Sequence, residues 1–531
     1  MTLKEVKDPV YNSIQLEDFA YKIIKTPQFQ RLRHLRQNGM AYLVYPSANH
    51  TRFEHSLGVY HLTKIALDHL NAQLPESLSD RVTKIVKTAA LVHDIGHGPF
   101  SHLFEQILHK NNIKLDGKQI CHESIGCDVF RKMMQRIKMD VGMDDHDIDC
   151  VCSLITGQEA DDETFKKYFF LNQIVSNSVN GLDTDKMDYL LRDSRSVGLG
   201  LTIDPIRILK NQSIFKYPKD STGKYYLSSS QKTKFDIMQV YHSRYVLNKI
   251  IYLNSKILAF NEIVCKIFDA SIKSNLLDIG QLYRKDTLPD DRILYYVQLQ
   301  VEDQNQKYKE LCKSFQILNY HMTPDIIFEL SITKDCKLTE KVSSQQREQY
   351  AKEQLIKISN VDSKLFEVVV ADINYGVKNQ NPLDFLPIHN KQTVFTPTQF
   401  AEQYGNRAQS IARSISSKTS KSLSSQTPAK FTRPVVINNV ATQDMLMPNI
   451  FKETCFCVFI YPEVQSQIKE QLKSAINKFL NINNMITDEA NYLLNAEISF
   501  DDPNKNLQAR AISPLTSSQE LNPLNFKFDE Q

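Results

Sequence analysis

The chain has 531 residues, of which 41% are hydrophobic and 24% charged, as in an ordinary globular protein rather than a disordered one. Its 64 Lys and Arg against 61 Asp and Glu leave a net charge of +3, too balanced for a protein that mainly coats nucleic acid or acidic membranes. Only 15 Gly and no Trp favour helices over a turn-rich, all-β fold.

The cysteines and the N-terminal residues indicate the compartment. Nine cysteines are scattered without a C-x-x-C motif, which favours free thiols in a reducing environment. The first residues lack the apolar core of a signal peptide, and no window approaches the roughly 18 apolar residues of a membrane span. We therefore expect a soluble intracellular protein of the nucleus, the cytosol or both, without a membrane partner.

Helical periodicity predicts a mainly α protein with a helical core and a smaller α+β C-terminal lobe. Two short β-branched segments, 365–373 and 455–461, predict strands, and Pro462 is expected to open an amphipathic helix that runs to about Leu480. The predicted units are a catalytic core (1–275), a helical extension (276–360), the α+β lobe (361–500) and a mobile tail (501–531).

A segment inside the predicted α+β lobe differs from its surroundings. Residues 406–433 are rich in Ser, Lys and Arg and poor in large apolar side chains, which predicts a disordered insertion. The positively charged side chains of this segment could contact phosphates, for example in weak binding of single-stranded nucleic acid. Alternatively, the segment could simply be a solvated loop.

The strongest local motif is LVHDIGHGPFSHLFE at residues 91–105. An apolar helix is expected to end at His93 and Asp94, and a second helix, with Pro99 in its first turn, carries the following His and Glu. An adjacent imidazole and carboxylate make a good start for a divalent metal site. A lone pair of this kind is also common on surfaces and in cores, so its meaning depends on further ligands.

Two other segments supply such ligands. TRFEHSLGVYHL, from residue 51, places Arg52 and His55 near a helix start, and NGLDTDKMDYLLRDS, from residue 180, contributes Asp185. On a helical wheel the second segment carries carboxylates, cations and a phenol on one side. That side suits either an ordinary solvated helix face or a pocket for a metal and a polyphosphate, and periodicity alone leaves both open.

The order His55, then His93–Asp94, then Asp185 is similar to the H…HD…D ligand order of HD-domain metal-dependent phosphohydrolases. The surrounding sequence resembles the deoxynucleoside triphosphate (dNTP) triphosphohydrolases that carry an HD domain, without the SAM domain that precedes it in part of that family. The resemblance is carried by TPQFQRLRHLRQNG (26–39), SANHTRFEHSLGVYHL (47–62), LVHDIGHGPFSHLFE (91–105), HES (122–124), IVSNSVNGLDTDKMDYLLRDS (174–194), YHSR (241–244) and ADINYGVKNQNPLDF (371–385).

The resemblance implies hydrolysis of dNTPs, dGTP included, to the deoxynucleoside and inorganic triphosphate, in control of dNTP levels. It makes the four residues just named the ligands of one transition metal, Fe, Mn or Zn, with Mg on the nucleotide phosphates. His97 would lie over the phosphates. His102, held by Glu105 and His122, would transfer a proton or act as nucleophile, and Glu105, which replaces the family's Asp, would raise its pKa.

Further matches imply substrate contacts. Two departures from the family, Asn38 for Leu and Leu253 for Gln, bear on the sugar and the base. The matched positions are Arg52, Lys186 and Arg244 on the triphosphate, Tyr189 beside it, Gln37 and Asp193 on the 3′-hydroxyl, and Tyr252 against the sugar.

The family also binds regulatory nucleotides between protomers, which implies a homo-oligomer, either a dimer or a tetramer. Lys25 replaces the family's guanine-reading Asp, and an ammonium cannot accept hydrogen bonds from guanine. Ser213 and Ser230 stand where a second pocket has Arg, so activation by GTP or dGTP is expected to be lost or altered. The matched regulatory positions are Lys4, Gln30, Arg33, Val44 and Tyr45.

Two other classes of function stay open at this stage. The chain could be a nucleic-acid-binding or nucleotide-sensing protein, which the basic segment 406–433 favours. It could also be an HD phosphodiesterase or nucleotidase, because HD sites serve those reactions as well. An intact set of four ligands argues against a pure binder, and the reaction product separates the enzymes from one another.

Overall fold

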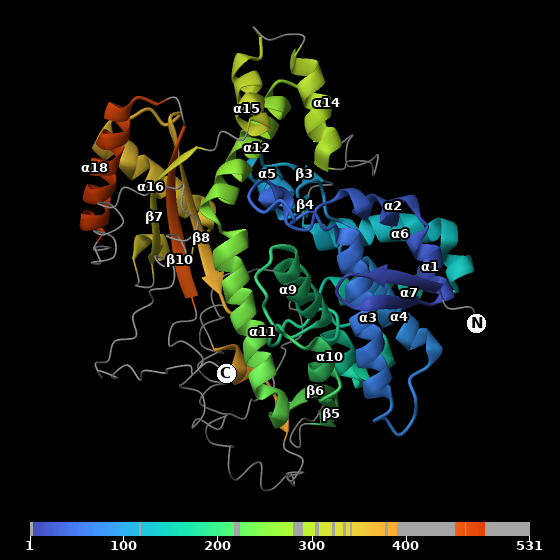
Figure 1. The fold of residues 1–531 in the computed structure, drawn as a ribbon. Helices are drawn as coiled ribbons and strands as arrows, with labels where there is room; N and C mark the ends of the chain where they lie inside the picture. Colours follow the sequence, from blue (N-terminus) through green and yellow to red (C-terminus); the bar gives the residue numbers. More distant parts are fainter. Residues whose placement is uncertain are drawn as a thin grey trace, which may run out of the picture.

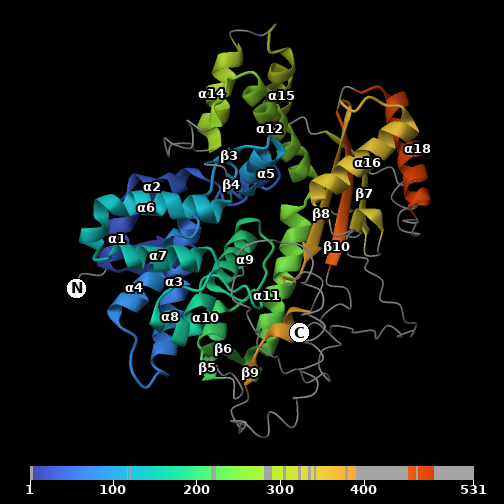
Figure 2. The ribbon, with the colours of Figure 1, turned by 180° about the vertical axis from the view of Figure 1, so that it is seen from behind.

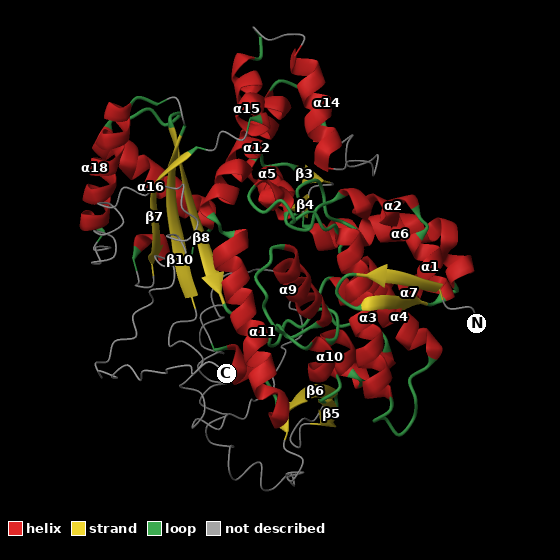
Figure 3. Ribbon diagram, in the orientation of Figure 1, coloured by secondary structure: helices red, strands yellow, loops and turns green. Residues whose placement is uncertain are grey.

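The computed structural model confirms a mainly α protein with a few small sheets beside its helices (Figure 3). The residues that it describes are 4–115, 118–119, 121–216, 223–279, 290–302, 307–320, 324–332, 336–339, 342–376, 381–389, 452–461 and 464–483. The predicted insertion 406–433 and the predicted tail 501–531 lie outside these residues. Among them, no helix is both long and apolar enough to cross a membrane.

The first part of the chain forms one helical body with a continuous apolar core. Its elements are β1 (Lys4–Asp8), β2 (Asn12–Leu16), α1 (Asp18–Ile24), α2 (Pro27–Gln30), α3 (Arg52–Asn71), α4 (Asp80–Val92), α5 (His102–Lys110), β3 (Lys114–Leu115), β4 (Lys118–Gln119), α6 (His122–Val141), α7 (Asp145–Ile155), α8 (Glu163–Lys167), α9 (Thr184–Ser196), α10 (Pro205–Leu209), β5 (Gln212–Lys216), β6 (Tyr225–Ser230), α11 (Lys234–Leu247) and α12 (Ser255–Lys273). In Figure 1, α9 lies between the long helix α11 and the group formed by α3, α4 and α7.

The second part of the chain builds a helical hairpin and a small α+β layer. Its elements are α14 (Asp290–Glu302), α15 (Lys309–Asn319), β7 (Asp325–Ile332), α16 (Ser344–Ser359), β8 (Phe366–Asn374), β9 (Ile388–His389), β10 (Lys452–Ile460) and α18 (Ser466–Ile482). The sheet β7-β10-β8 is antiparallel, with β10 in the centre. Helices α16 and α18 cover one face of it, and α12 lies on the other, as Figures 1 and 2 show.

The strand predictions for the C-terminal lobe are confirmed by β8 and β10, whereas the predicted helical extension 276–360 also contains a strand that the prediction did not include. Strand β7 lies within it and pairs along its length with β10, more than 100 residues further on. Its apolar residues alternate at Ile326, Phe328, Leu330 and Ile332, a period-two signal that was present in the sequence. The division of the chain into domains itself stays a prediction.

The turn before α5 also differs from the prediction. Pro99 does not lie in the first turn of that helix, which begins at His102. Phe100 and Ser101 adopt φ angles of 62° and 59°, in the left-handed region, so the backbone cannot be helical before His102. A non-helical turn therefore precedes α5, and His102 is the first residue after it.

Helices α3 and α9 approach each other closely at Gly58. A Cβ atom at this position would lie 1.8 Å from Asp188 Oδ1 and 2.5 Å from Arg192 Nη2. Asp188 and Arg192 form a bidentate ion pair with N–O distances of 3.0 Å, and Arg192 also reaches Asp8 at 2.9 Å. All three side chains are buried, and their charges are paired, as burial requires.

We expect Gly58→Ala to lower the free energy of unfolding by about 3 kcal/mol, because the added methyl group must displace the buried pair of Asp188 and Arg192. Urea denaturation followed by circular dichroism measures the change. Gly126→Ala in α6 is the matched control, since the nearest atom to its Cβ lies at 3.4 Å. Equal stability of the two variants would contradict the proposed contact.

Candidate metal centre and active site

The four predicted metal ligands converge on one point. His55 lies in the first turns of α3, His93 and Asp94 follow the last residue of α4, and Asp185 lies in the first turn of α9. The Nε2 atoms of His55 and His93 are 3.2 Å apart, and Asp185 Oδ1 lies 3.0 Å and 3.5 Å from them. Asp94 carboxylate oxygens lie 3.6 Å from His55 Nε2 and 3.4 Å from His93 Nε2.

Both imidazoles are held from behind. His93 Nδ1 donates to the carbonyl oxygen of Ala90 at 2.9 Å, and since that oxygen can only accept, the proton is on Nδ1. His55 Nδ1 bonds Asp188 Oδ2 at 2.8 Å. In each ring Nε2 therefore faces the centre, as metal-ligating histidines require. The sequence analysis missed Asp188, although it lies one helical turn after Asp185.

The charges at this centre favour a cation. Burial opposes ionisation of Asp94, but the neighbouring Arg52 and histidines hold the pKa of its carboxyl well below the usual range. Burial likewise opposes protonation of His55, yet hydrogen bonds to Asp185 and Asp188 raise its pKa to about 10. A proton on His55 thus balances the negative charge of the carboxylates in the absence of an ion. A divalent ion would take over this role, and its binding would release the proton.

The donor set fits a divalent metal. Two imidazole nitrogens and two carboxylate oxygens form a borderline-to-hard set, which suits transition metals better than Ca²⁺. His55, His93 and Asp94 form one of the described residue groups whose ligand atoms are close enough together for an ion, and Asp185 hydrogen-bonds to one of these histidines.

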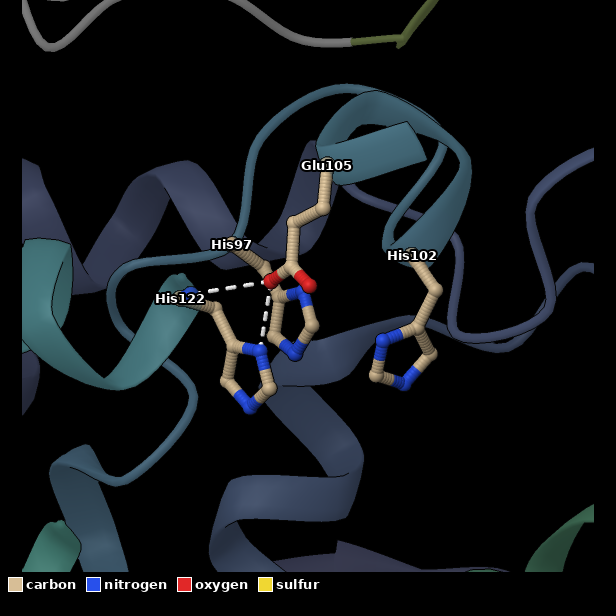
Figure 4. A group of neighbouring side chains, drawn as sticks. All are labelled: His97, His102, Glu105 and His122. Carbon is tan, nitrogen blue, oxygen red and sulfur yellow. Dashed lines mark hydrogen bonds and ion pairs between the residues drawn. The ribbon is translucent and has the colours of Figure 1, made fainter. Parts of the chain in front are cut away.

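A second group, formed by the predicted catalytic residues His97, His102, Glu105 and His122, lies beside the first (Figure 4). Glu105 Oε1 accepts hydrogen bonds from His122 Nδ1 at 2.5 Å and from the His122 backbone N–H at 2.9 Å. The rings of His97 and His122 are stacked with centroids 4.0 Å apart, and the His102 ring stands edge-on to both.

This geometry corrects the expected role of Glu105. The described contacts place its carboxylate on His122, at the start of α6, and not on His102 one turn before it. Burial, with Arg52 and His122 nearby, lowers the pKa of His102 to about 4 and outweighs the charge of Glu105, which does act to raise that pKa, as predicted. Helix spacing showed that a contact with Glu105 was possible, but the packing of α6 decided which imidazole receives it.

His97 connects the two groups. Its Nε2 lies 3.3 Å from Asp94 Oδ1, while Nδ1 is buried without a hydrogen-bond partner among the described residues. Burial, with Arg52 nearby, lowers the pKa of His97 well below the ordinary value. A neutral ring with an unsatisfied nitrogen in the cavity wall suits contact with a bound ligand.

The predicted phosphate-binding residues line one large cavity together with both histidine groups. Its volume is about 1330 Å³, and its wall includes Arg52, Lys186, Tyr189 and Arg244. Each cation already has a partner: Arg52 pairs with Asp94, Lys186 Nζ donates to Asp183 at 2.7 Å, and Arg244 Nη1 donates to Tyr189 Oη at 2.7 Å. A polyphosphate must therefore compete with these contacts or share them.

The predicted sugar-binding residues meet at another part of the same wall. Asp193 accepts from Tyr252 Oη at 2.6 Å and contacts His50 Nε2 at 2.7 Å. Gln37 lines the same cavity, and its Oε1 is buried without a hydrogen-bond partner among the described residues. Sequence reasoning missed His50, which the motif SANHTRFEH contains but whose contact with α9 only the fold creates.

Part of the predicted regulatory set lies together. Gln30 and Arg33 line a second cavity of about 330 Å³ with Lys25, and Arg33 Nε donates to Gln30 Oε1 at 2.9 Å. Lys4 lies over the ring of Tyr21, another wall residue, with Nζ 3.3 Å from the centroid.

The other regulatory positions lie elsewhere. Val44 and Tyr45 are not part of the wall of the second cavity, and Tyr45 Oη donates to the carbonyl oxygen of Ile250 at 3.1 Å. Ser213 Oγ lies 3.3 Å from His389 Nε2, and Ser230 Oγ caps a short turn through the Lys232 N–H. The structure thus gathers four of the eight regulatory positions, Lys4, Lys25, Gln30 and Arg33, and separates the other four.

Comparison with known proteins agrees with this geometry. Residues 52–189 match the HD domain family. The chain is 34% identical to an HD domain-containing protein of Acanthamoeba polyphaga mimivirus, over 49% of this chain and 56% of that protein. It is 29% identical to the deoxynucleoside triphosphate triphosphohydrolase SAMHD1 homolog of Dictyostelium discoideum and 28% identical to deoxynucleoside triphosphate triphosphohydrolase SAMHD1 of Homo sapiens, over 75% and 76% of this chain and 76% and 70% of those proteins. The chain therefore contains a region that matches the HD domain family, and over about three quarters of its length it is similar to deoxynucleoside triphosphate triphosphohydrolases.

Proposed function

We propose that this protein hydrolyses deoxynucleoside triphosphates, dGTP among them, to the deoxynucleoside and inorganic triphosphate. The observation that carries the proposal is the convergence of His55, His93, Asp94 and Asp185 at the wall of one cavity. The wall of the same cavity also contains the cationic side chains of Arg52, Lys186 and Arg244. The names of the relatives support the same activity. A role in limiting dNTP levels would follow from it.

In this proposal the four ligands hold one Fe, Mn or Zn ion, while Mg²⁺ accompanies the nucleotide phosphates. The bound transition metal would polarise a phosphate oxygen and lower the pKa of a water molecule. Asp188 and the Ala90 carbonyl keep the two imidazoles aimed at that position. These two contacts would thereby hold both imidazole ligands in place before an ion binds.

Substrate binding would use the remaining wall of the cavity. Arg52, Lys186 and Arg244 would exchange part of their present contacts for phosphate oxygens, with Arg offering a planar pair of donors. Asp193 and Gln37 would bind the 3′-hydroxyl, and Tyr252, held by Asp193, would close the space beside C2′. This arrangement favours a deoxyribose over a ribose.

The reaction adds a water oxygen to the α-phosphorus and breaks the bond between that phosphorus and O5′. One proton must leave the water, and one must reach O5′. His102 is neutral at pH 7 because its pKa is about 4, so it can accept a proton or act as nucleophile. Glu105 raises the pKa of His122 despite burial, which makes the pair of His122 and Glu105 a source of a proton.

Several finer points stay predictions. These are the identity of the metal, the preferred base, assembly into a dimer or tetramer, and action in the nucleus or the cytosol. The basic segment 406–433, on which the nucleic-acid alternative rested, lies outside the described residues.

Combined replacement of His93 and Asp94 by Ala should lower triphosphate release from dGTP or dTTP by at least roughly 1000-fold. The reason is that a metal contributes several kcal/mol of transition-state stabilisation, and ~1.4 kcal/mol corresponds to tenfold in rate. Ion chromatography of the products measures the release, and elemental analysis measures the bound metal. His146→Ala, at a half-exposed side chain away from the cavity, is the control. Undiminished turnover in the double variant would refute the proposal, and orthophosphate or nucleoside monophosphate as product would favour a phosphatase or a phosphodiesterase.

GTP should change the turnover of dTTP by less than about twofold, because the Lys25 ammonium in the second cavity can donate but not accept hydrogen bonds. Lys25→Asp should introduce activation by GTP. Steady-state rates with and without GTP test this, with Lys22→Asp, at an exposed residue outside the cavity, as the matched control. Strong activation of the unaltered protein by GTP would contradict the role given to Lys25.

A further inference from the structure

The backbone just before His102 is held in an unfavourable conformation. Phe100 and Ser101 are consecutive non-glycine residues with φ of 62° and 59°. Such conformations are unfavourable for residues other than glycine and persist only where the surrounding structure over-determines them. The cause of this conformation is therefore a contact that the chain makes with the turn, and His102, the next residue, depends on it for its position.

The carboxylate of Asp290 provides one such contact, at the backbone of Phe100. Asp290 Oδ1 accepts a hydrogen bond from the Phe100 N–H at 2.8 Å, and Oδ2 accepts one from the Arg36 N–H at 2.9 Å. The side chain is 1% exposed, so both bonds form away from water, where hydrogen bonds to a charged acceptor are strong. Asp290 is the first residue of α14, nearly 190 residues after the turn that it holds.

From this turn, hydrogen bonds continue to the metal centre. Ser101 Oγ donates to the carbonyl oxygen of Arg36 at 2.7 Å and accepts from Arg52 Nε at 2.8 Å. The Arg52 guanidinium in turn pairs with the metal ligand Asp94. One buried carboxylate on α14 thus connects the segment before α3 with the turn before α5, and these two parts also contact each other through Ser101.

A purely structural role would also explain a buried carboxylate that ties α14 to the core. The two roles differ in what they predict for the site. The metal ligands lie on α3, on α9 and at the end of α4, and in the described contacts none of them touches Asp290. Asp290 binds the backbone N–H groups of the turn, whereas Arg52 keeps its own ion pair with Asp94, so loss of Asp290 should displace His102 directly and should affect the metal ligands and the substrate affinity much less.

We propose that Asp290 is a positioning residue for the reaction, which acts by holding the Phe100–Ser101 turn so that His102 faces the scissile bond. The inference rests on the proposed function, because it assigns His102 to the chemical step. It connects the α14–α15 hairpin, which projects from the body at the top of Figure 1, to the catalytic group.

The test compares Asp290→Ala and Asp290→Asn with the unaltered full chain. Asp290→Ala should lower kcat for dTTP by roughly 100-fold, the cost of misplacing a reacting group by about 1 Å, with KM changed less than about threefold. Asp290→Asn, which keeps one acceptor for the two N–H groups, should fall between. Bound metal, measured by elemental analysis, should be equal in all three.

Asp147→Asn is the matched control, since Asp147 is also a buried carboxylate that accepts from a backbone N–H and an arginine, but in α7 and outside the cavity. It should lower the thermal midpoint without lowering kcat. Unchanged kcat in Asp290→Ala would overturn the inference, as would parallel losses of kcat, metal and stability. If Asp290→Ala does not fold, Asp290→Asn carries the same comparison.

Nuclear magnetic resonance of ¹⁵N-histidine-labelled protein separates this inference from the proposed function. The ring signals of His102, assigned with His102→Gln, should shift in Asp290→Asn, while those of His55 and His93 should not. If the unaltered protein releases no triphosphate, the proposed function fails, whereas the positioning contact is still tested by these signals. Unshifted His102 signals would overturn it.

Discussion

The close approach of α3 and α9 is the contact on which the site depends. At Gly58 the two helices leave no room for a side chain, and this brings Asp188 behind His55 and Asp185 in front of it. The approach buries carboxylates, which would be costly without Arg192 as a counter-ion on the same helix. Arg192 also reaches Asp8, so the first strand of the chain contributes to the support of a metal ligand at residue 55.

The charged side chains of the cavity follow the same rule, that a buried charge needs a partner. Every cation proposed to bind phosphate is already paired, and the carboxylates among these partners include the metal ligand Asp94. If the proposed function holds, a nucleotide with its metal ions would enter by exchanging partners, without leaving an isolated buried charge on either side. The neutral imidazoles of His97 and His102 add no repulsion towards a metal placed beside them.

The C-terminal lobe shows how far local patterns reach. The apolar segments of β8 and β10 were recognisable as strands, because nearly every residue in them suits a buried sheet. Strand β7 alternates apolar and polar residues but follows two helices, and the helical trend of its surroundings concealed it. The same residues could also form a polar connecting segment. They form a strand because they pair with β10, which lies far away in the chain.

By itself the sequence determined the mainly α class, and it picked out the four side chains proposed as metal ligands and the cationic and polar residues proposed to bind substrate, because these predictions depend on residue type and order. It also placed Glu105 within reach of His102. Only the tertiary structure decided that Glu105 holds His122, that Asp188 and His50 support the site, and that Asp290 meets the turn before α5. These contacts join segments that are distant in sequence. Side chains at such distances meet only when helices pack, and packing selects one partner among several that the spacing allows.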